Sequence, residues 1–187
     1  MLRGKRRDFG NLAGWVPAGK NMNAMAQWIA QQFDPALGWK DVAWIRSLWP
    51  GKLVLKGILD AEDARIAADH GADAIVVSNH GGRQLDSAPA TITVLPDIAA
   101  AVGHRTEILF DGGIRSGQDV LKAVALGAKG TLIGRSWLYG LAAGGEAGVR
   151  QTLEILRKEL DVSMALAGLS DIRSVDRSAL YGRHTAG

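Results

Sequence analysis

Four short apolar runs recur along the chain from Lys52 onward, and their repetition limits the fold more than any other feature. The runs are LVL (53–55), AIVV (74–77), ILF (108–110) and TLI (131–133). Each is followed by a polar or glycine-rich break and then by a stretch with helical character. Apolar runs without alternation suit strands that are buried on both faces of a parallel sheet. The pattern therefore predicts four consecutive βα units.

Glycines mark the predicted ends of two helices in this repeat. AEDARIAADHGA ends near Gly71 and GQDVLKAVALGA ends near Gly127, and glycine is common just past a helix C-terminus. A last helix is predicted over about 148–160, where four apolar side chains fall on one stripe. They are Val149, Leu153, Leu156 and Leu160.

Repeated βα units can close into a barrel or remain an open, doubly wound sheet. The least usual side chains are predicted to lie just past the C-terminal ends of the apolar runs, where β/α proteins place their active sites. They are Lys56, His80, Arg83, Asp111, Arg115 and Arg135. We therefore expect a partial (β/α)8 TIM barrel, with the four units as strands 5–8. A complete barrel needs eight units and typically about 250 residues.

The first 50 residues differ from the repeat, because they hold five of the six tryptophans and no long apolar run. We expect a loop and two helices there, the first over about 22–33. The second follows Asp34-Pro35 and ends before Pro50-Gly51, with four apolar residues on one face. They are Val42, Ile45, Leu48 and Trp49. The predicted division is a Trp-rich segment, 1–50, and a barrel half, 51–187.

Composition narrows the function classes. The chain has no cysteine, which excludes disulfides and thiolate chemistry, and nothing predicts a metal site. No apolar stretch approaches the roughly 18 residues of a membrane span, so we expect a cytoplasmic protein. The net charge is only +3, and its densest basic cluster lies at residues 3–7. That cluster could contact nucleic acid or anionic lipid, but a solvated loop is favoured, and no nucleic-acid partner is predicted.

Two glycine-arginine motifs follow the last two predicted strands. In DGGIR (111–115) and IGR (133–135), glycines let backbone N–H groups approach an anion, and arginines add charge-assisted hydrogen bonds. Barrels often bind phosphate after strands seven and eight. The alternative is that the glycines make tight turns and the arginines are solvated. A phosphate site is favoured because the motif occurs in two successive units.

Lys56 and the stretch SNHGGR (78–83) add chemistry at neighbouring strand ends. A lysine there needs an anion or an electron-rich group. A flavin edge, a Schiff base and a simple ion pair all remain open. His80 can accept a proton near neutral pH, and Arg83 can bind a carboxylate through two hydrogen bonds. A structural histidine is the alternative, but together these groups predict a site for 2-hydroxy-acid oxidation.

The motifs VLKG, SNHGGRQLD, DGGIRSGQDVLKAVALGA and IGR resemble the C-terminal half of the FMN-dependent α-hydroxy-acid dehydrogenase and oxidase family. The resemblance covers about residues 4–180. FDPALGWKDVAWIRSLWPGKLVLKGILDAEDAR is most similar to the bacterial respiratory L-lactate dehydrogenases, with mandelate dehydrogenases close behind.

The resemblance implies FMN as cofactor and a role for each matching residue. His80 would be the catalytic base and Arg83 would bind the substrate carboxylate. Eight residues would bind FMN: Lys56, Ser78, Asp111, Gly112, Gly113, Arg115, Gly134 and Arg135. The family's first four strands supply further groups, including a second substrate arginine and the aspartate that orients the histidine. None of these has a matching position here.

Two classes of function follow. The first is FMN-dependent oxidation of an L-2-hydroxy acid, with L-lactate favoured and a mandelate- or glycolate-type specificity as the variant. A quinone, a cytochrome or oxygen would accept the electrons. The second is a truncated, non-catalytic half-barrel that binds FMN or phosphate. We expect a homo-oligomer or a complementing half-barrel as partner. The Trp-rich segment could also hold the protein on the inner face of the cell membrane.

Overall fold

The computed structural model describes residues 22–181, and the chain divides into two compact units, residues 1–41 and 42–187. In the first unit, helix α1 (Met22–Ala30) lies where a helix was predicted, but it ends three residues before Phe33. The N–H of Gln32 donates to Ile29 O at 3.0 Å. The last turn therefore tightens to an i→i+3 bond, which often ends an α-helix.

The second unit is built on a parallel sheet of four strands in the order β1-β2-β3-β4. The strands are β1 (Val54–Ile58), β2 (Ala74–Val77), β3 (Glu107–Phe110) and β4 (Gly130–Thr131). Each grows from one of the four apolar runs, and every residue of β2 is buried, as expected for a strand covered on both faces. β4 is shorter than the TLI run, and it pairs with β3 only through Gly130 and Thr131.

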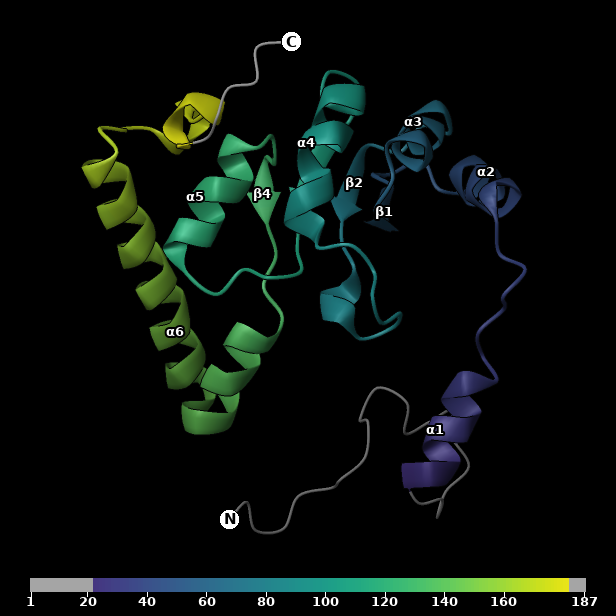
Figure 1. The fold of residues 1–187 in the computed structure, drawn as a ribbon. Helices are drawn as coiled ribbons and strands as arrows, with labels where there is room; N and C mark the ends of the chain where they lie inside the picture. The colour runs from purple at the N-terminus through teal and green to yellow at the C-terminus, as the bar shows by residue number, and fades with distance from the viewer. Residues whose placement is uncertain (1–21, 182–187) are drawn as a thin grey trace. The chain divides into compact units, whose positions relative to one another are not determined.

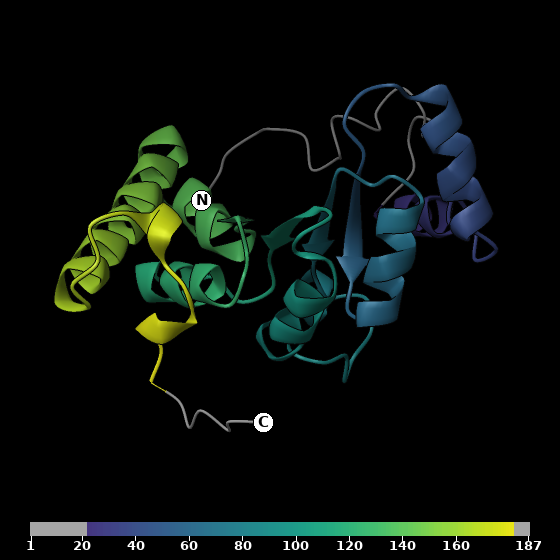
Figure 2. The same cartoon turned by 90° about the horizontal axis from the view of Figure 1, so that it is seen from above.

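Helices α3 (Ala61–Asp69), α4 (Thr91–Val102) and α5 (Gly117–Ala125) follow the first three strands (Figures 1 and 2). Helix α3 packs on β1 and β2, α4 packs on β3, and α5 packs on β4. Ile75, Leu95, Ile98 and Ile108 form a fully buried core between sheet and helices. Consecutive strand order with right-handed crossovers places successive helices on one face of a sheet, as in a barrel.

The two predicted glycine stops are confirmed. Gly71 and Gly127 follow the last residues of α3 and α5, with φ of +76° and +111°. The N–H of Gly71 donates to Ala68 O at 3.0 Å, and that of Gly127 donates to Val124 O at 2.9 Å. A side chain rarely adopts these backbone angles, so glycine ends each helix and turns the chain toward the next strand.

The last helix is longer than predicted. Helix α6 (Arg135–Leu166) starts directly after β4, well before residue 148, and it is broken at Gly144 and Gly145. The two arms touch where Gly140 faces Gly148, since a Cβ on Gly148 would lie 1.9 Å from Gly140 O. Glycine-rich sequence across 140–148 hid the first arm, because glycine disfavours a helix by propensity alone. Short 3₁₀ turns follow at Ile172–Ser174 and Arg177–Ala179.

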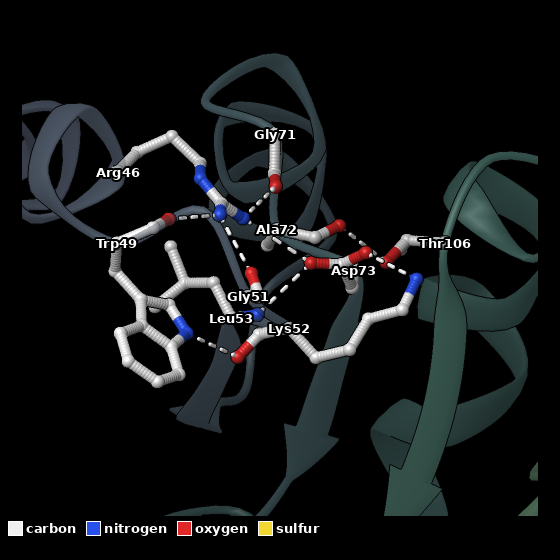
Figure 3. Close-up of polar contacts among 9 residues, drawn as sticks. All are labelled: Arg46, Trp49, Gly51, Lys52, Leu53, Gly71, Ala72, Asp73 and Thr106. Carbon is white, nitrogen blue, oxygen red and sulfur yellow. Dashed lines mark hydrogen bonds and ion pairs between the residues drawn. The ribbon is translucent and has the colours of Figure 1, made fainter.

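Helix α2 (Trp39–Leu48) is held at the N-terminal end of the sheet by Arg46 (Figure 3). Its guanidinium donates to Asp73 Oδ2 at 3.2 Å, to Gly51 O at 2.6 Å and to the carbonyl of Trp49. Lys52 Nζ lies 2.7 Å from Asp73 Oδ1, and the N–H of Leu53 donates to Asp73 Oδ2 at 2.9 Å. Chiefly the bond from Lys52, and then that from Leu53, lower the pKa of Asp73 to about 2.

The predicted apolar face of α2 is exposed rather than packed. Ile45, Leu48 and Trp49 have exposed fractions of 42%, 64% and 54%, and neighbouring Trp44 is 62% exposed. Periodicity alone cannot tell a face that packs inside one chain from a face that stays open. Within residues 22–181, no helix is both long and apolar enough to cross a membrane.

Candidate functional site

Lys56 lies inside β1, which corrects the prediction that it follows the strand. It pairs with Val76 of β2, and the register then shifts between Lys56 and Ile58. Gly57 stands at this bulge with φ of +101°. The apolar run ends before Lys56, but strand pairing uses backbone groups and continues past a polar side chain. The bulge is a common device for aiming a side chain near a site.

Three side chains from neighbouring strands meet in a polar triad, Lys56, Ser78 and Asp111. Lys56 Nζ donates to Ser78 Oγ at 2.7 Å and lies 2.9 Å from Asp111 Oδ2. The hydroxyl of Ser78 donates to Asp111 Oδ1 at 2.5 Å. Ser78 is 1% exposed, and the side chains of Lys56 and Asp111 are 43% and 15% exposed. The triad thus holds a cation, Lys56, whose side chain is partly exposed to solvent.

The triad also holds the start of the His80 loop, which we define as residues 79–83. The N–H of His80 donates to Ser78 Oγ at 3.1 Å. His80 has φ of +53°, and Gly81 and Gly82 follow with +67° and +70°, in the short 3₁₀ turn His80–Gly82. Positive φ is rare for a residue with a side chain, and it concentrates at functional sites. Sequence reasoning marked His80 by its neighbours, and the backbone is unusual at the same position.

Arg135 connects the His80 loop with the start of α6. Its Nη2 donates to Gly81 O at 3.2 Å, across 54 residues of sequence. A Cβ on Gly81 would lie 3.0 Å from the same nitrogen, so a glycine at this position lets the guanidinium approach. The structure therefore brings the predicted base and one predicted phosphate-binding arginine to the same part of the sheet edge.

Gly112, Gly113 and Gly134 form what we call the glycine cradle. A Cβ on Gly113 or Gly134 would meet no atom within 4 Å, so both leave open space. Gly134 caps the N-terminus of α6 without a side chain covering the first N–H groups. Such an end attracts anions. The hydroxyl of Ser136 donates to Ile114 O at 3.0 Å and so joins the two halves of the cradle.

Two predicted site arginines remain unpaired. The side chains of Arg83 and Arg115 are exposed, and within residues 22–181 neither forms a hydrogen bond or ion pair. The backbone N–H of Arg115 does bond to Asp119 Oδ2, at 3.0 Å. Both guanidinium groups therefore have all their donors available for an anion, but the structure does not join Arg83 to the triad.

Sequence reasoning missed Asn79, Thr91 and Asp119. Asp119 closes a capping box with Ser116 at the start of α5, and the spacing S-x-x-D was a readable signal for it. Asn79 Oδ1 accepts the N–H of Gly81 at 3.0 Å, a short-range turn that asparagine often makes. Nothing local marked Thr91, whose hydroxyl donates to Gly112 O, 21 residues away, at 3.1 Å.

The arrangement can bind an anion in the glycine cradle, present an ammonium group beside it and place a histidine nearby. Within residues 22–181, no three histidine or carboxylate side chains are grouped as a metal site would need. The anion-binding glycines, the ammonium group and the histidine are the components that a site for a phosphate-bearing cofactor needs. Their order along the chain follows the order of the strands.

Comparisons with known proteins match this chain to one family. The family model described as FMN-dependent dehydrogenase matches residues 4–182. An L-lactate dehydrogenase of a Caulobacter species is 51% identical over 179 residues, which are 96% of this chain and 47% of that protein. An L-lactate oxidase of a Nostoc species is 52% identical over 166 residues, 89% of this chain and 46% of that protein. The chain thus spans about half the length of these relatives.

Solved structures give the same picture. A monotopic membrane protein, (S)-mandelate dehydrogenase, superposes with a TM-score of 0.81 at 43% identity, covering 85% of this chain and 42% of that one. A mandelate oxidase superposes with a TM-score of 0.77 at 52% identity, covering 83% of this chain and 45% of that one. The predicted partial β/α barrel is confirmed, since four parallel βα units match part of these flavoenzymes.

The match over nearly the whole chain, the identity of about half and the shared fold point to one ancestry. The predicted resemblance and the predicted cofactor class are confirmed. This chain belongs to the family of FMN-dependent dehydrogenases, oxidoreductases whose cofactor is FMN.

Proposed function

We propose that this chain contributes the C-terminal half of an FMN-dependent enzyme that oxidises an L-2-hydroxy acid to the 2-oxo acid. One observation carries the proposal: the Lys56–Ser78–Asp111 triad holds the backbone of His80 through Ser78 Oγ at 3.1 Å. A cation suited to a reduced cofactor and a candidate proton acceptor are therefore fixed by one buried hydroxyl.

The residues present fit FMN. Gly113 and Gly134 leave the space that a Cβ would fill, and the first N–H groups of α6 face no capping side chain. A phosphate would be held there with the help of Arg115 and Arg135. Lys56 donates one of its three hydrogens to Ser78 and forms an ion pair with Asp111, and its ammonium group can still donate to the cofactor. Ser78, Asp111 and Gly112 complete the proposed cofactor contacts.

Each substrate-facing residue has a proposed task. Bound FMN supplies a two-electron acceptor. Arg83, whose guanidinium is unpaired and exposed, binds the substrate carboxylate in two parallel hydrogen bonds and so orients the α-carbon. His80 accepts a proton as the substrate is oxidised. The backbone that carries its ring is held in position by the bond from its N–H to Ser78 Oγ.

L-lactate is the proposed substrate, because lactate-oxidising relatives match along nearly the whole chain. A mandelate- or glycolate-type specificity is the variant, since the structural matches include mandelate enzymes. A quinone or a cytochrome is the proposed electron acceptor. The proposed partner is a complementing half-barrel or a second copy of the chain, because within the described sheet each of β1 and β4 pairs on one side only.

We also propose a peripheral position on the inner face of the cell membrane. The exposed side chains of Trp44 and Leu48 in α2, and of Trp49 directly after it, are suited to an interfacial contact. The proposed boundary between this Trp-rich segment and the barrel half lies at residues 50 and 51. Vesicle sedimentation with anionic and neutral lipids tests the membrane contact. Sedimentation of the chain with neither type of vesicle would contradict it.

A second candidate function is a half-barrel that binds FMN without turnover. The observation that favours this second candidate is that the chain spans only about half the length of the relatives it matches. The missing part would contain the groups for which the sequence offers no matching position.

Flavin bleaching separates the two candidates. The purified chain is mixed with FMN and L-lactate, with and without a separately expressed N-terminal half of a relative, and D-lactate serves as the matched control. We expect bleaching with L-lactate when the second half is supplied. A yellow protein that stays yellow in both mixtures would favour the non-catalytic half-barrel. A chain that never becomes yellow would contradict both.

A further inference from the structure

Two residues outside the proposed cofactor and substrate contacts join the His80 loop to the glycine cradle. Asn79 Oδ1 accepts the N–H of Gly81 at 3.0 Å, and Asn79 Nδ2 donates to Pro89 O at 3.2 Å. Two residues later, Thr91 starts α4, and its hydroxyl donates to Gly112 O at 3.1 Å. The chain from 89 to 91 thus bridges the loop after β2 and the loop after β3.

The two side chains also lie beside the same residue of the cradle, Gly112. A Cβ on Gly112 would lie 2.7 Å from Asn79 Oδ1 and 2.9 Å from Thr91 Oγ1. Gly112 has φ of +91°, which a side chain rarely adopts. Asn79 and Thr91 therefore pack closely on the backbone of the cradle, and they bond to it or to the His80 loop.

The hydroxyl of Thr91 is not needed for its own helix. Thr91 is fully buried, and a buried hydroxyl requires a partner. Residues at a helix start usually use such a hydroxyl for local capping. In α4, the N-cap residue is Ala90 and no side chain caps the helix, while the exposed Thr93 donates its hydroxyl hydrogen to Ala90 O at 2.7 Å. Thr91 instead donates its single hydroxyl hydrogen to the carbonyl oxygen of Gly112.

We propose that Asn79 and Thr91 are positioning residues that hold the His80 loop and the glycine cradle in fixed register, so that the proton acceptor and the bound phosphate belong to one rigid frame. This inference rests on the proposed function for its meaning in catalysis. Thr91 acts through the orientation of the Gly112 peptide, and Asn79 acts through the turn that carries His80.

Thr91→Val tests the bridge, because valine has nearly the same shape and lacks the hydroxyl. We expect FMN affinity, measured by quenching of flavin fluorescence, to fall about threefold to tenfold. Thr91→Ser restores the hydroxyl and is expected to restore the affinity to within about twofold. The matched control is Thr93→Val, which removes an exposed hydroxyl two residues away and is expected to leave the affinity unchanged.

A second readout does not depend on FMN. The carbonyl ¹³C resonance of Gly112 in the cofactor-free chain reports its hydrogen bond directly. We expect it to shift in Thr91→Val and to return in Thr91→Ser. Should Thr91→Val fail to fold, Asn79→Ala carries the test, with faster hydrogen exchange at the N–H of Gly81 as the expected result.

The outcomes distinguish this inference from the proposed function. An unchanged Gly112 resonance in Thr91→Val, or a serine variant as weak as the valine variant, overturns the bridge. For Asn79→Ala, unchanged exchange at Gly81 does the same. A wild-type chain that does not bind FMN overturns the proposed function, while the NMR readouts still decide whether the bridge exists.

Discussion

At the scale of single residues, the backbone of His80 is the most informative feature. Its φ of +53° costs of order 1 kcal/mol or more and persists only where the surroundings hold it. Ser78 Oγ accepts the N–H of His80, and Asn79 Oδ1 accepts the next N–H along the chain, that of Gly81. The backbone strain therefore lies at His80, the same residue that the sequence marked as the candidate base.

Replacing His80 by alanine tests its proposed role. His80→Ala keeps the backbone N–H that bonds to Ser78, so we expect flavin retention to be largely unchanged. Turnover in the complemented barrel should fall by about 10²–10⁴-fold, the usual contribution of a general base. Loss of flavin from this variant, measured by absorbance after gel filtration, would contradict the role given to the imidazole. His104→Ala serves as control, because His104 is exposed at the far end of α4.

Residue type and position marked Lys56 and Asp111 as unusual residues at strand ends, and the family resemblance marked Ser78. Their mutual bonds could not be predicted, since Ser78 and Asp111 are 33 residues apart. Thr91 stayed hidden for the same reason. A threonine at a helix start is ordinary, and its partner is chosen by the packing of α4 against β3.

At the scale of elements, the helix stops, the buried strands and the second arm of α6 were predictable, while the first arm of α6 was not. The segment 140–148 contains four glycines: Gly140 and Gly148 lie where the two arms touch, and Gly144 and Gly145 form the break between the arms. Propensity penalises such a segment, but the packing of two arms requires residues without side chains. β1 shows a similar limit, because pairing through Lys56 depends on β2.

The contact between the arms of α6 predicts a large effect from one methyl group. Gly148→Ala places a Cβ 1.9 Å from Gly140 O, so the arms must separate. We expect the free energy of unfolding to fall by about 1–3 kcal/mol, as for other overpacked contacts. Gly144→Ala is the control, because its Cβ meets nothing within 4 Å and its φ of −148° suits any residue. Equal urea midpoints for the two variants would contradict this packing.

The ion pairs at the start of the sheet predict how stability changes in acid. The pKa of Asp73 is lowered from 3.8 to about 2 in the folded chain, so its contribution is fully present above about pH 4. That contribution is lost as pH falls toward 2. Asp73→Asn should lower the melting temperature at pH 7 and flatten its acid dependence. Asp97→Asn is the control at an exposed carboxylate, and the same melting temperature for both variants would contradict this account.

At the scale of the whole molecule, the described sheet is part of a barrel that its relatives close with further strands. The repeat of apolar runs predicted this architecture, because four βα units with parallel strands in consecutive order are the repeat of a β/α barrel. The substrate and the electron acceptor could not be predicted in the same way. They depend on groups beyond the four strand ends, for which the sequence has no matching positions.

The central claim is that the ends of neighbouring strands hold the phosphate of FMN beside the triad. Equilibrium titration of the purified chain with FMN and with riboflavin, which lacks the phosphate, tests it most directly. We expect FMN to bind at least about tenfold more tightly, since a phosphate in the glycine cradle gains several charge-assisted hydrogen bonds. Equal affinity for the two flavins, or no binding of either, would contradict the account.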